Sequence, residues 1–224
     1  MKLHSLCIAL VAALGASAAR ADSTVNISWQ GKDLTGLQLT AFDDSYSTTG
    51  PVVTTSYRTT ALNYTNNASH ESFIAYCIEP AESNTKTAKD YTASVFSGPR
   101  VSLVQGLFSQ YYDGLSTPTS KAAFQVALWE IMRESGSTLD ASAGSFRVGA
   151  TYGSVATLAN DYLANAASYS GPALFTLTRL SYTGQQDLIT ASRIATAVPE
   201  PMSGAMLMSG LAVLGLLARR RMPR

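Results

Sequence analysis

The segment that most constrains the fold is Phe73-Ile74-Ala75-Tyr76-Cys77-Ile78, which is followed directly by Glu79-Pro80. A short apolar run without polar alternation is typical of a strand that is covered on both faces. Proline cannot donate a ladder hydrogen bond, so the strand is expected to end at residues 79–80. We therefore expect a central strand, covered by other elements, that places Cys77 near its end.

The segments on either side of this strand predict a mixture of strands and helices. Alternating or β-branched stretches predict strands at 25–29, 37–42, 51–57, 59–64, 91–96, 174–178 and 187–194. Helical spacing of apolar residues predicts helices at 101–112, from 118 to about 134, and at 155–167. Thr117-Pro118 supplies an N-cap and a proline at the first helical position. The order suggests an α+β fold, a β-sandwich or barrel with a helical insertion, plus one C-terminal transmembrane helix.

Both ends of the chain resemble targeting signals. Residues 1–21 have a basic start, a short apolar run and small residues before Asp22, as in a cleaved signal peptide. At the other end, residues 202–218 are an uncharged run of 17 residues, the short limit for a membrane span. The tail at 219–224 contains Arg219, Arg220 and Arg221, which predicts that the tail stays on the cytoplasmic side.

The expected extracellular domain, residues 22–197, is acidic although the whole chain has a formal net charge of +1. It carries ten Lys or Arg residues and fourteen Asp or Glu residues. It has no basic stripe and no interleaved aromatic run, so we expect no nucleic-acid partner.

The number of cysteines limits the chemistry. Cys7 lies in the leader, so Cys77 is the single cysteine of the mature chain and cannot form an internal disulfide. Three interpretations remain: an inert buried thiol, an intermolecular disulfide, or a cysteine retained for its reactivity.

A glutamine 48 residues downstream of Cys77 offers a partner for that thiol. On the helix that begins at residue 118, Gln125 falls on the apolar side, well away from the polar side of Glu130 and Glu134. A buried amide needs a partner, and a backbone group of the packed sheet is the simplest one. Alternatively, the thiol of Cys77 attacks the amide, releases ammonia and leaves a thioester. Such a bond needs apolar cover, which Tyr76, Phe124 and Trp129 could supply.

Two segments resemble the thioester domains of bacterial surface adhesins: Tyr76-Cys77-Ile78-Glu79 and Phe124-Gln125-Val126-Ala127-Leu128-Trp129. That family joins a cysteine at a strand end to a glutamine in a Thr-Gln-x-Ala-Ile-Trp-like helix. The resemblance implies that Cys77 is the thiol partner, that Gln125 is the acyl donor and that Trp129 is part of the cover. This chain departs from the pattern with Glu79 in place of Asp and Phe124 in place of Thr.

The C-terminal residues 198–224 resemble a PEP-CTERM sorting signal through Pro199, Glu200 and Pro201, the apolar run and the arginine cluster. That resemblance implies recognition by an exosortase-type processing enzyme in a Gram-negative, exopolysaccharide-producing bacterium. It implies an inner-membrane-anchored intermediate, followed by display at the cell surface or release into the matrix.

The chain holds weaker candidate residues beside the Cys77–Gln125 pair. His70 could act with Cys77 in a hydrolase, although it would face the opposite side of an extended strand. Asp43-Asp44 could contribute to a calcium site but lacks known ligand spacing and fits a turn better. We expect Glu130 and Glu134 to form a solvated helix face, and we expect no metal or cofactor.

Two functions of different classes remain. The first is covalent, single-use attachment, not a turnover enzyme, through a Cys77–Gln125 thioester to an amine-bearing surface molecule, or to an exopolysaccharide that carries amino groups. The second is a non-covalent structural protein of an exopolysaccharide or biofilm matrix, in which Cys77 and Gln125 are ordinary core residues.

Overall fold

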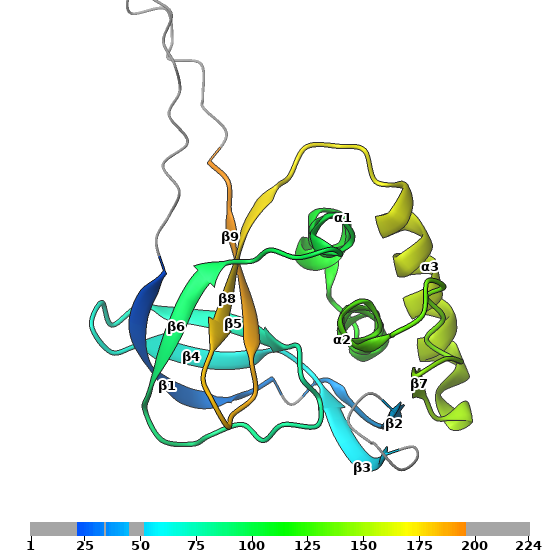
Figure 1. Cartoon of the computed structure of the whole chain (residues 1–224), viewed down its shortest axis with the longest axis horizontal. Helices are drawn as coiled ribbons and strands as arrows, with labels where there is room; N and C mark the ends of the chain where they lie inside the picture. Colours follow the sequence, from blue (N-terminus) through cyan, green and yellow to red (C-terminus); the bar gives the residue numbers. More distant parts are fainter. Residues whose placement is uncertain (1–21, 34, 45–51, 196–224) are drawn as a thin grey trace, which may run out of the picture. The chain divides into compact units, whose positions relative to one another are not determined.

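Six strands close into a barrel in the order β1-β4-β5-β9-β8-β6 (Figure 1). The computed structural model describes residues 22–33, 35–44 and 52–195, without the side chains of 52–57. The barrel strands are β1 (Ser23–Lys32), β4 (Leu62–Asn66), β5 (Ser72–Cys77), β6 (Lys89–Val95), β8 (Phe175–Ser181) and β9 (Leu188–Arg193).

Strand β1 closes the barrel because its two halves pair with different neighbours. The first half, up to Ile27, pairs with β6, and the second half pairs with β4. The register shifts between Trp29 and Gly31, where Gly31 has a φ of 130°. Ile27, Tyr64 and Tyr91 are buried in the core cluster of the barrel.

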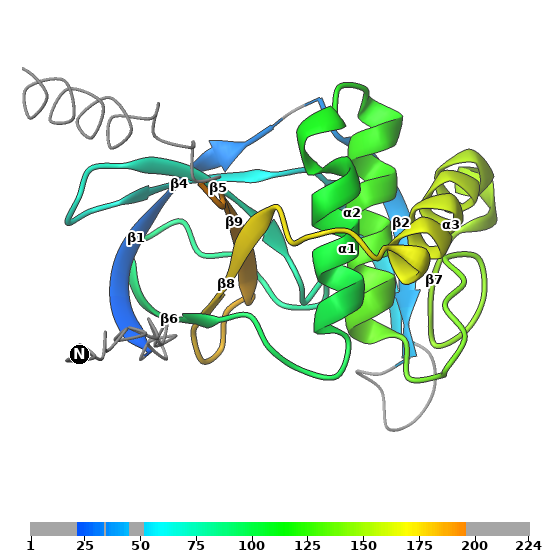
Figure 2. The ribbon, with the colours of Figure 1, turned by 90° about the horizontal axis from the view of Figure 1, so that it is seen from above.

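A second, three-stranded sheet has the order β3-β2-β7. Its strands are β2 (Leu37–Asp43), β3 (Val52–Thr59) and β7 (Phe146–Val148). The helices are α1 (Val101–Tyr111), α2 (Pro118–Arg133) and α3 (Gly153–Ser168), with short 3₁₀ turns at Tyr112–Gly114 and Ala150–Tyr152. Figures 1 and 2 show α1 and α2 lying between the barrel and α3, with α2 beside the small sheet.

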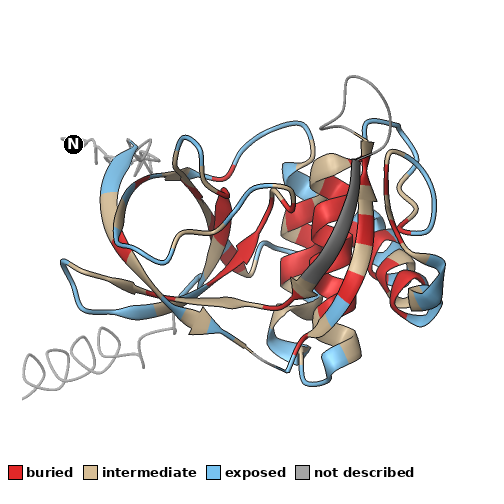
Figure 3. Cartoon of the chain, turned by 90° about the horizontal axis from the view of Figure 1, so that it is seen from below, coloured by how far each residue is buried: buried red, intermediate tan, exposed pale blue. Residues whose placement is uncertain are grey.

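Helix α2 is the centre of the helical layer. It begins as predicted: Thr117 and Ser120 form a capping box, and Pro118 opens the helix. Every residue from Ala122 to Ile131 is buried, which Figure 3 shows as a nearly continuous red helix. A helix buried all round must be covered on all sides, and β5, the small sheet, α1 and α3 provide that cover.

The expected fold class is corrected by the structure. The described residues form a domain with one closed β-barrel, three α-helices and a separate small sheet. The sequence pattern did not predict β7 as a strand. Among residues 22–33, 35–44 and 52–195, no helix is both long enough and apolar enough to cross a membrane. A transmembrane helix is therefore no part of the described fold.

Several predictions about the two ends fall outside the described residues. These are the leader (1–21), the predicted span (202–218), the sorting motif with Pro199, Glu200 and Pro201, and the tail with Arg219, Arg220 and Arg221.

Candidate functional site

Cys77 is the last residue of β5, and it lies opposite Leu188 of β9. The ladder continues for one residue, since the Ile78 N–H donates to the carbonyl of Asp187 at 3.0 Å. Cys77 is 5% exposed and is a free thiol. The strand end is therefore fixed by its neighbour, and the thiol is held away from solvent.

Gln125 meets Cys77 from α2. Its amide Nε2 donates to the backbone carbonyl of Cys77 at 2.8 Å, and its side chain is 1% exposed. Its Oε1 is also buried and accepts no hydrogen bond from any described residue. The structure thus places side by side the two residues that the sequence predicted as partners.

The thiol of Cys77 is neutral in this environment. Burial raises its pKa to about 12, and hydrogen bonds from the Trp129 side chain and the Glu79 backbone lower it only in part. Gln125 and Trp129 are one helical turn apart on α2, so both reach Cys77 from the same side.

Aromatic side chains cover the pair. The ring centroids of Phe124 lie 5.0 Å from those of both Tyr76 and Phe108, and Tyr76 also contacts Tyr112. Tyr76, Phe124 and Trp129 were predicted as cover, and all three are buried. The contributions of Phe108 and Tyr112 were missed, because helical spacing marks core residues without saying which site they cover.

Trp129 extends this cover toward the small sheet. Its ring packs edge-on against Phe146 of β7, with centroids 6.2 Å apart. This contact was not predictable, since a three-residue strand carries too little pattern to detect.

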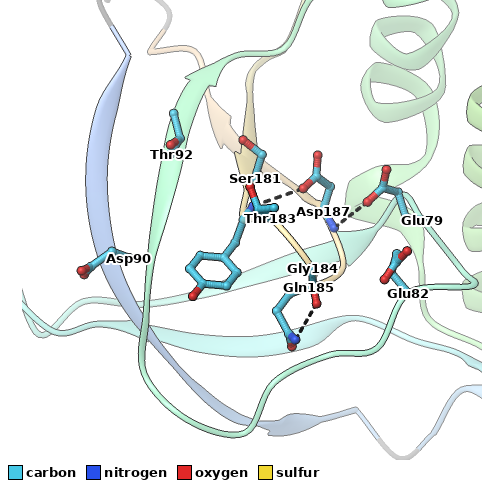
Figure 4. A pocket seen from close by; sticks show the side chains of 10 residues that line it. Glu79, Glu82, Asp90, Thr92, Ser181, Thr183, Gly184, Gln185 and Asp187 are labelled. Carbon is cyan, nitrogen blue, oxygen red and sulfur yellow. Dashed lines mark hydrogen bonds between the residues drawn. The ribbon is translucent and has the colours of Figure 1, made fainter.

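An acidic cavity of about 570 Å³ lies beyond the end of β5 (Figure 4). Glu79, Glu82, Asp90 and Asp187 all line it. The Asp187 N–H donates to Glu79 Oε2 at 3.2 Å, and the Asp187 carboxylate pairs with Arg179. Within the described residues, no group of three or more His, Cys, Asp or Glu side chains is placed to hold a metal ion.

A second cavity, of about 420 Å³, lies on the Tyr76 side of the site. Tyr76, Tyr112, Asp33 and Lys121 are among the residues that line it. Lys121 forms an ion pair with Asp33, with Nζ 2.5 Å from Oδ2. The sequence did not indicate that the loop after β1 would reach the start of α2.

The weaker candidates do not join the site. His70 is exposed, lies in the turn before β5 with a φ of 59°, and is therefore at the opposite end of that strand from Cys77. Asp43 pairs with Arg133 at 2.8 Å, and Asp44 pairs with Arg147 at 3.1 Å.

The prediction that Glu130 and Glu134 form a solvated face of α2 is wrong. Glu130 is fully buried and Glu134 is 7% exposed. The loop between α2 and β7 covers them: Glu130 accepts from the Asp140 N–H, and Glu134 accepts from the Gly136, Ser145 and Phe146 N–H groups.

This arrangement brings the Gln125 carboxamide against the backbone of Cys77, and both residues are buried beside aromatic side chains. Attack of the sulfur on the amide carbon would form a carbon–sulfur bond and expel the nitrogen. Because water is excluded, an activated acyl group would be shielded from hydrolysis at this position.

Comparisons with known proteins found similar solved structures, among them two bacterial surface domains. No family model matches the sequence, and no curated protein matches it significantly. The chain is similar to the N-terminal domain of the Streptococcus pyogenes pilus tip adhesin Cpa, with a TM-score of 0.41 and 14% identity, covering 74% of this chain and 99% of that chain. It is also similar to the N-terminal thioester domain of a Clostridium perfringens surface protein, solved as a cysteine-to-alanine mutant, with a TM-score of 0.38 and 14% identity, covering 60% and 89%.

Proposed function

We propose that Cys77 and Gln125 form an internal thioester, and that this bond attaches the protein covalently to an amine-bearing surface partner. The observation that carries the proposal is the contact between the two residues. Gln125 is buried in α2, and its amide nitrogen lies 2.8 Å from the Cys77 carbonyl oxygen.

The bond-forming step balances without a further reactant. The Cys77 sulfur bonds to Cδ of Gln125, the Cδ–Nε2 bond breaks, and the thiol proton leaves with the nitrogen as ammonia. The thiol begins protonated, because burial raises its pKa to about 12. The proton is therefore available to the leaving group.

The attachment step is a transfer of the same acyl group. A neutral primary amine of the partner attacks the thioester carbonyl, the carbon–sulfur bond breaks, and the proton lost by the amine returns to sulfur. The product is an amide at residue 125 and a free Cys77 thiol. The site works once, so it is a cross-linking module and not a turnover enzyme.

The proposal extends to how this cross-linking module reaches the cell surface, and this part is based on the two ends of the sequence. We propose export through the leader at 1–21. We further propose processing by an exosortase-type enzyme that recognises Pro199, Glu200 and Pro201. The acceptor would then be an amine on a surface molecule, or an amino sugar of an exopolysaccharide.

The intact mass of the freshly purified mature protein tests the proposal. We expect a mass that is lower than the sequence mass by one ammonia, and a methylamine adduct after incubation with methylamine. Cys77→Ala and Gln125→Ala should each have the full mass calculated from the variant's own sequence, and neither should gain a methylamine adduct. A wild-type protein with full mass and a thiol that can be alkylated after denaturation would overturn the proposal.

One observation favours the alternative, a non-covalent matrix protein. The Nε2 group of Gln125 already has a backbone acceptor, so the residue is explained as a hydrogen-bonded core side chain. In that case wild type and Cys77→Ala would both be inert to methylamine.

A further inference from the structure

Lys121 is an amine that belongs to the chain itself and lies one helical turn before Gln125 in α2. Side chains four residues apart on a helix are neighbours, with Cβ atoms about 5–6 Å apart. A lysine at this spacing can reach the carbonyl carbon of residue 125. A thioester at Gln125 would therefore have an acceptor amine within reach before any partner arrives.

The structure holds this amine in another direction. Lys121 Nζ lies 2.5 Å from Asp33 Oδ2 and donates to Thr35 Oγ1 at 2.7 Å. Asp33 and Thr35 belong to the loop between β1 and β2, which is far from α2 in sequence. We call these two residues the Asp33 clamp.

The clamp is itself ordered by local hydrogen bonds. Asp33 Oδ1 accepts from the Thr35 N–H at 2.9 Å and from its hydroxyl at 2.6 Å, which leaves Oδ2 for Lys121. The Lys121 hydrogen bond, followed by that of Thr35, lowers the pKa of Asp33 to about 2. The carboxylate is therefore charged at any pH at which the protein would work.

The ion pair of Lys121 and Asp33 borders the cavity on the Tyr76 side of the site. Asp33 and Lys121 line it together with Tyr76, the residue before Cys77. Lys121 therefore lies on the Tyr76 side of the Cys77–Gln125 pair, and its contacts with the clamp hold its amine against Asp33 and Thr35.

We propose that Lys121 is an internal competitor for the thioester, and that the Asp33 clamp withholds it so that the acyl group remains for an external amine. This inference rests on the proposed function. Without the clamp, neutral Nζ of Lys121 attacks the carbonyl carbon of residue 125 and the carbon–sulfur bond breaks. The proton from Nζ passes to the Cys77 sulfur, and the product is a side-chain amide between residues 121 and 125.

The test compares the full chain with Asp33→Asn, using methylamine as the probe. The internal amide and the thioester both lack one ammonia, so mass alone does not separate them. In Asp33→Asn we expect the lowered mass to persist, the methylamine adduct to fall about tenfold or more because a tethered amine outcompetes a free one, and Cys77 to become alkylatable after denaturation. Tandem mass spectrometry should locate a link between residues 121 and 125.

The double variant Asp33→Asn/Lys121→Arg is the matched control. It keeps the positive charge but removes the acylatable amine, so methylamine labelling should return to the wild-type level. Thr35→Ala leaves the ion pair between Lys121 and Asp33 in place, so methylamine labelling should fall in this variant too, but less than in Asp33→Asn. This variant provides the test if Asp33→Asn does not fold.

Labelling at the wild-type level in Asp33→Asn, or loss of the thioester by hydrolysis without a 121–125 link, would overturn the inference. A wild-type protein that has full mass and a free thiol would instead overturn the proposed function. The two failures are therefore distinguishable.

Discussion

Glu130 shows how a single buried carboxyl sets the pH response of this protein. Its Oε1 accepts from the Asp140 N–H at 2.8 Å, while its Oε2 is buried with no hydrogen-bond partner among the described residues. Burial raises the pKa of Glu130 to about 8, and the charges of Glu134 and Asp140 add to that effect. The side chain is therefore protonated in the folded protein at neutral pH.

Stability should fall as pH rises from about 4.5 to about 8. Below the ordinary pKa of 4.5 both states hold the proton. Between 4.5 and 8 the unfolded chain releases the proton while the folded protein keeps it, so the unfolded state gains up to a few kcal/mol, at about 1.4 kcal/mol per pH unit.

Urea unfolding at several pH values measures this dependence, and Glu130→Gln should remove most of the slope. Glu134→Gln is the matched control, because hydrogen bonds from the Gly136 N–H and Ser145 outweigh burial and lower the pKa of Glu134. It should leave most of the slope above pH 5 in place, because burial and not the charge of Glu134 is the largest cause of the raised Glu130 pKa. A wild-type stability that is flat from pH 5 to 8 would contradict this assignment.

The residues of the candidate site were predictable to different degrees. Cys77 and Gln125 could be paired because both stand on apolar segments and because the quoted motifs resemble a known family. Glu130 could not be placed, since periodicity describes one helix and not what lies against it. The loop that covers Glu130 is held in place because its backbone N–H groups donate to the carboxylate of Glu134. This arrangement is non-local.

At the scale of elements, α2 carries Gln125 together with Phe124 and Trp129, two of the three residues predicted to cover it. Its start was predictable, because capping is local chemistry that Thr117 and Pro118 display in the sequence. Its surroundings were not, because β5, α1, α3 and the small sheet reach it from distant parts of the chain.

Removing the cap should loosen the start of α2. The Thr117 side chain accepts from the Ser120 N–H at 3.0 Å, and the Ser120 hydroxyl accepts from the Thr117 N–H at 3.0 Å. Thr117→Ala should lower the free energy of unfolding by about 1 kcal/mol, measured by denaturant titration. Thr119→Ala, in the same turn, should cost clearly less, and equal losses in both variants would argue against a role for the cap.

At the scale of the whole described molecule, barrel closure depends on β1 serving two neighbours. Local alternation predicted most of the strands, but closure is a property of long-range pairing that no single segment displays. The change of partner occurs at Ile27, and the register of the β1–β4 pairing shifts shortly after it, between Trp29 and Gly31. Each half of β1 has a partner on one side, and the two pairings together close the barrel.

Gly31 is the position where closure can be tested. Its φ of 130° is one that side chains with a Cβ rarely adopt, although no neighbouring atom would meet an added Cβ within 4 Å. Gly31→Ala should therefore lower the free energy of unfolding by about 1–3 kcal/mol through backbone strain alone. Gly114→Ala, which is equally open but has no such φ, should be nearly neutral. Equal effects of the two substitutions would exclude strain at the register shift as the cause.

The central claim is a bond between Cys77 and Gln125, and a digest at acidic pH tests it most directly because acid preserves a thioester. Peptic fragments of freshly purified protein should include one cross-linked species that joins the segment around Cys77 to the segment around Gln125, with the summed mass less one ammonia. Brief hydroxylamine treatment should split that species into a free-thiol fragment and a fragment modified at residue 125. Recovery of the two segments only as separate, unmodified peptides would contradict the account.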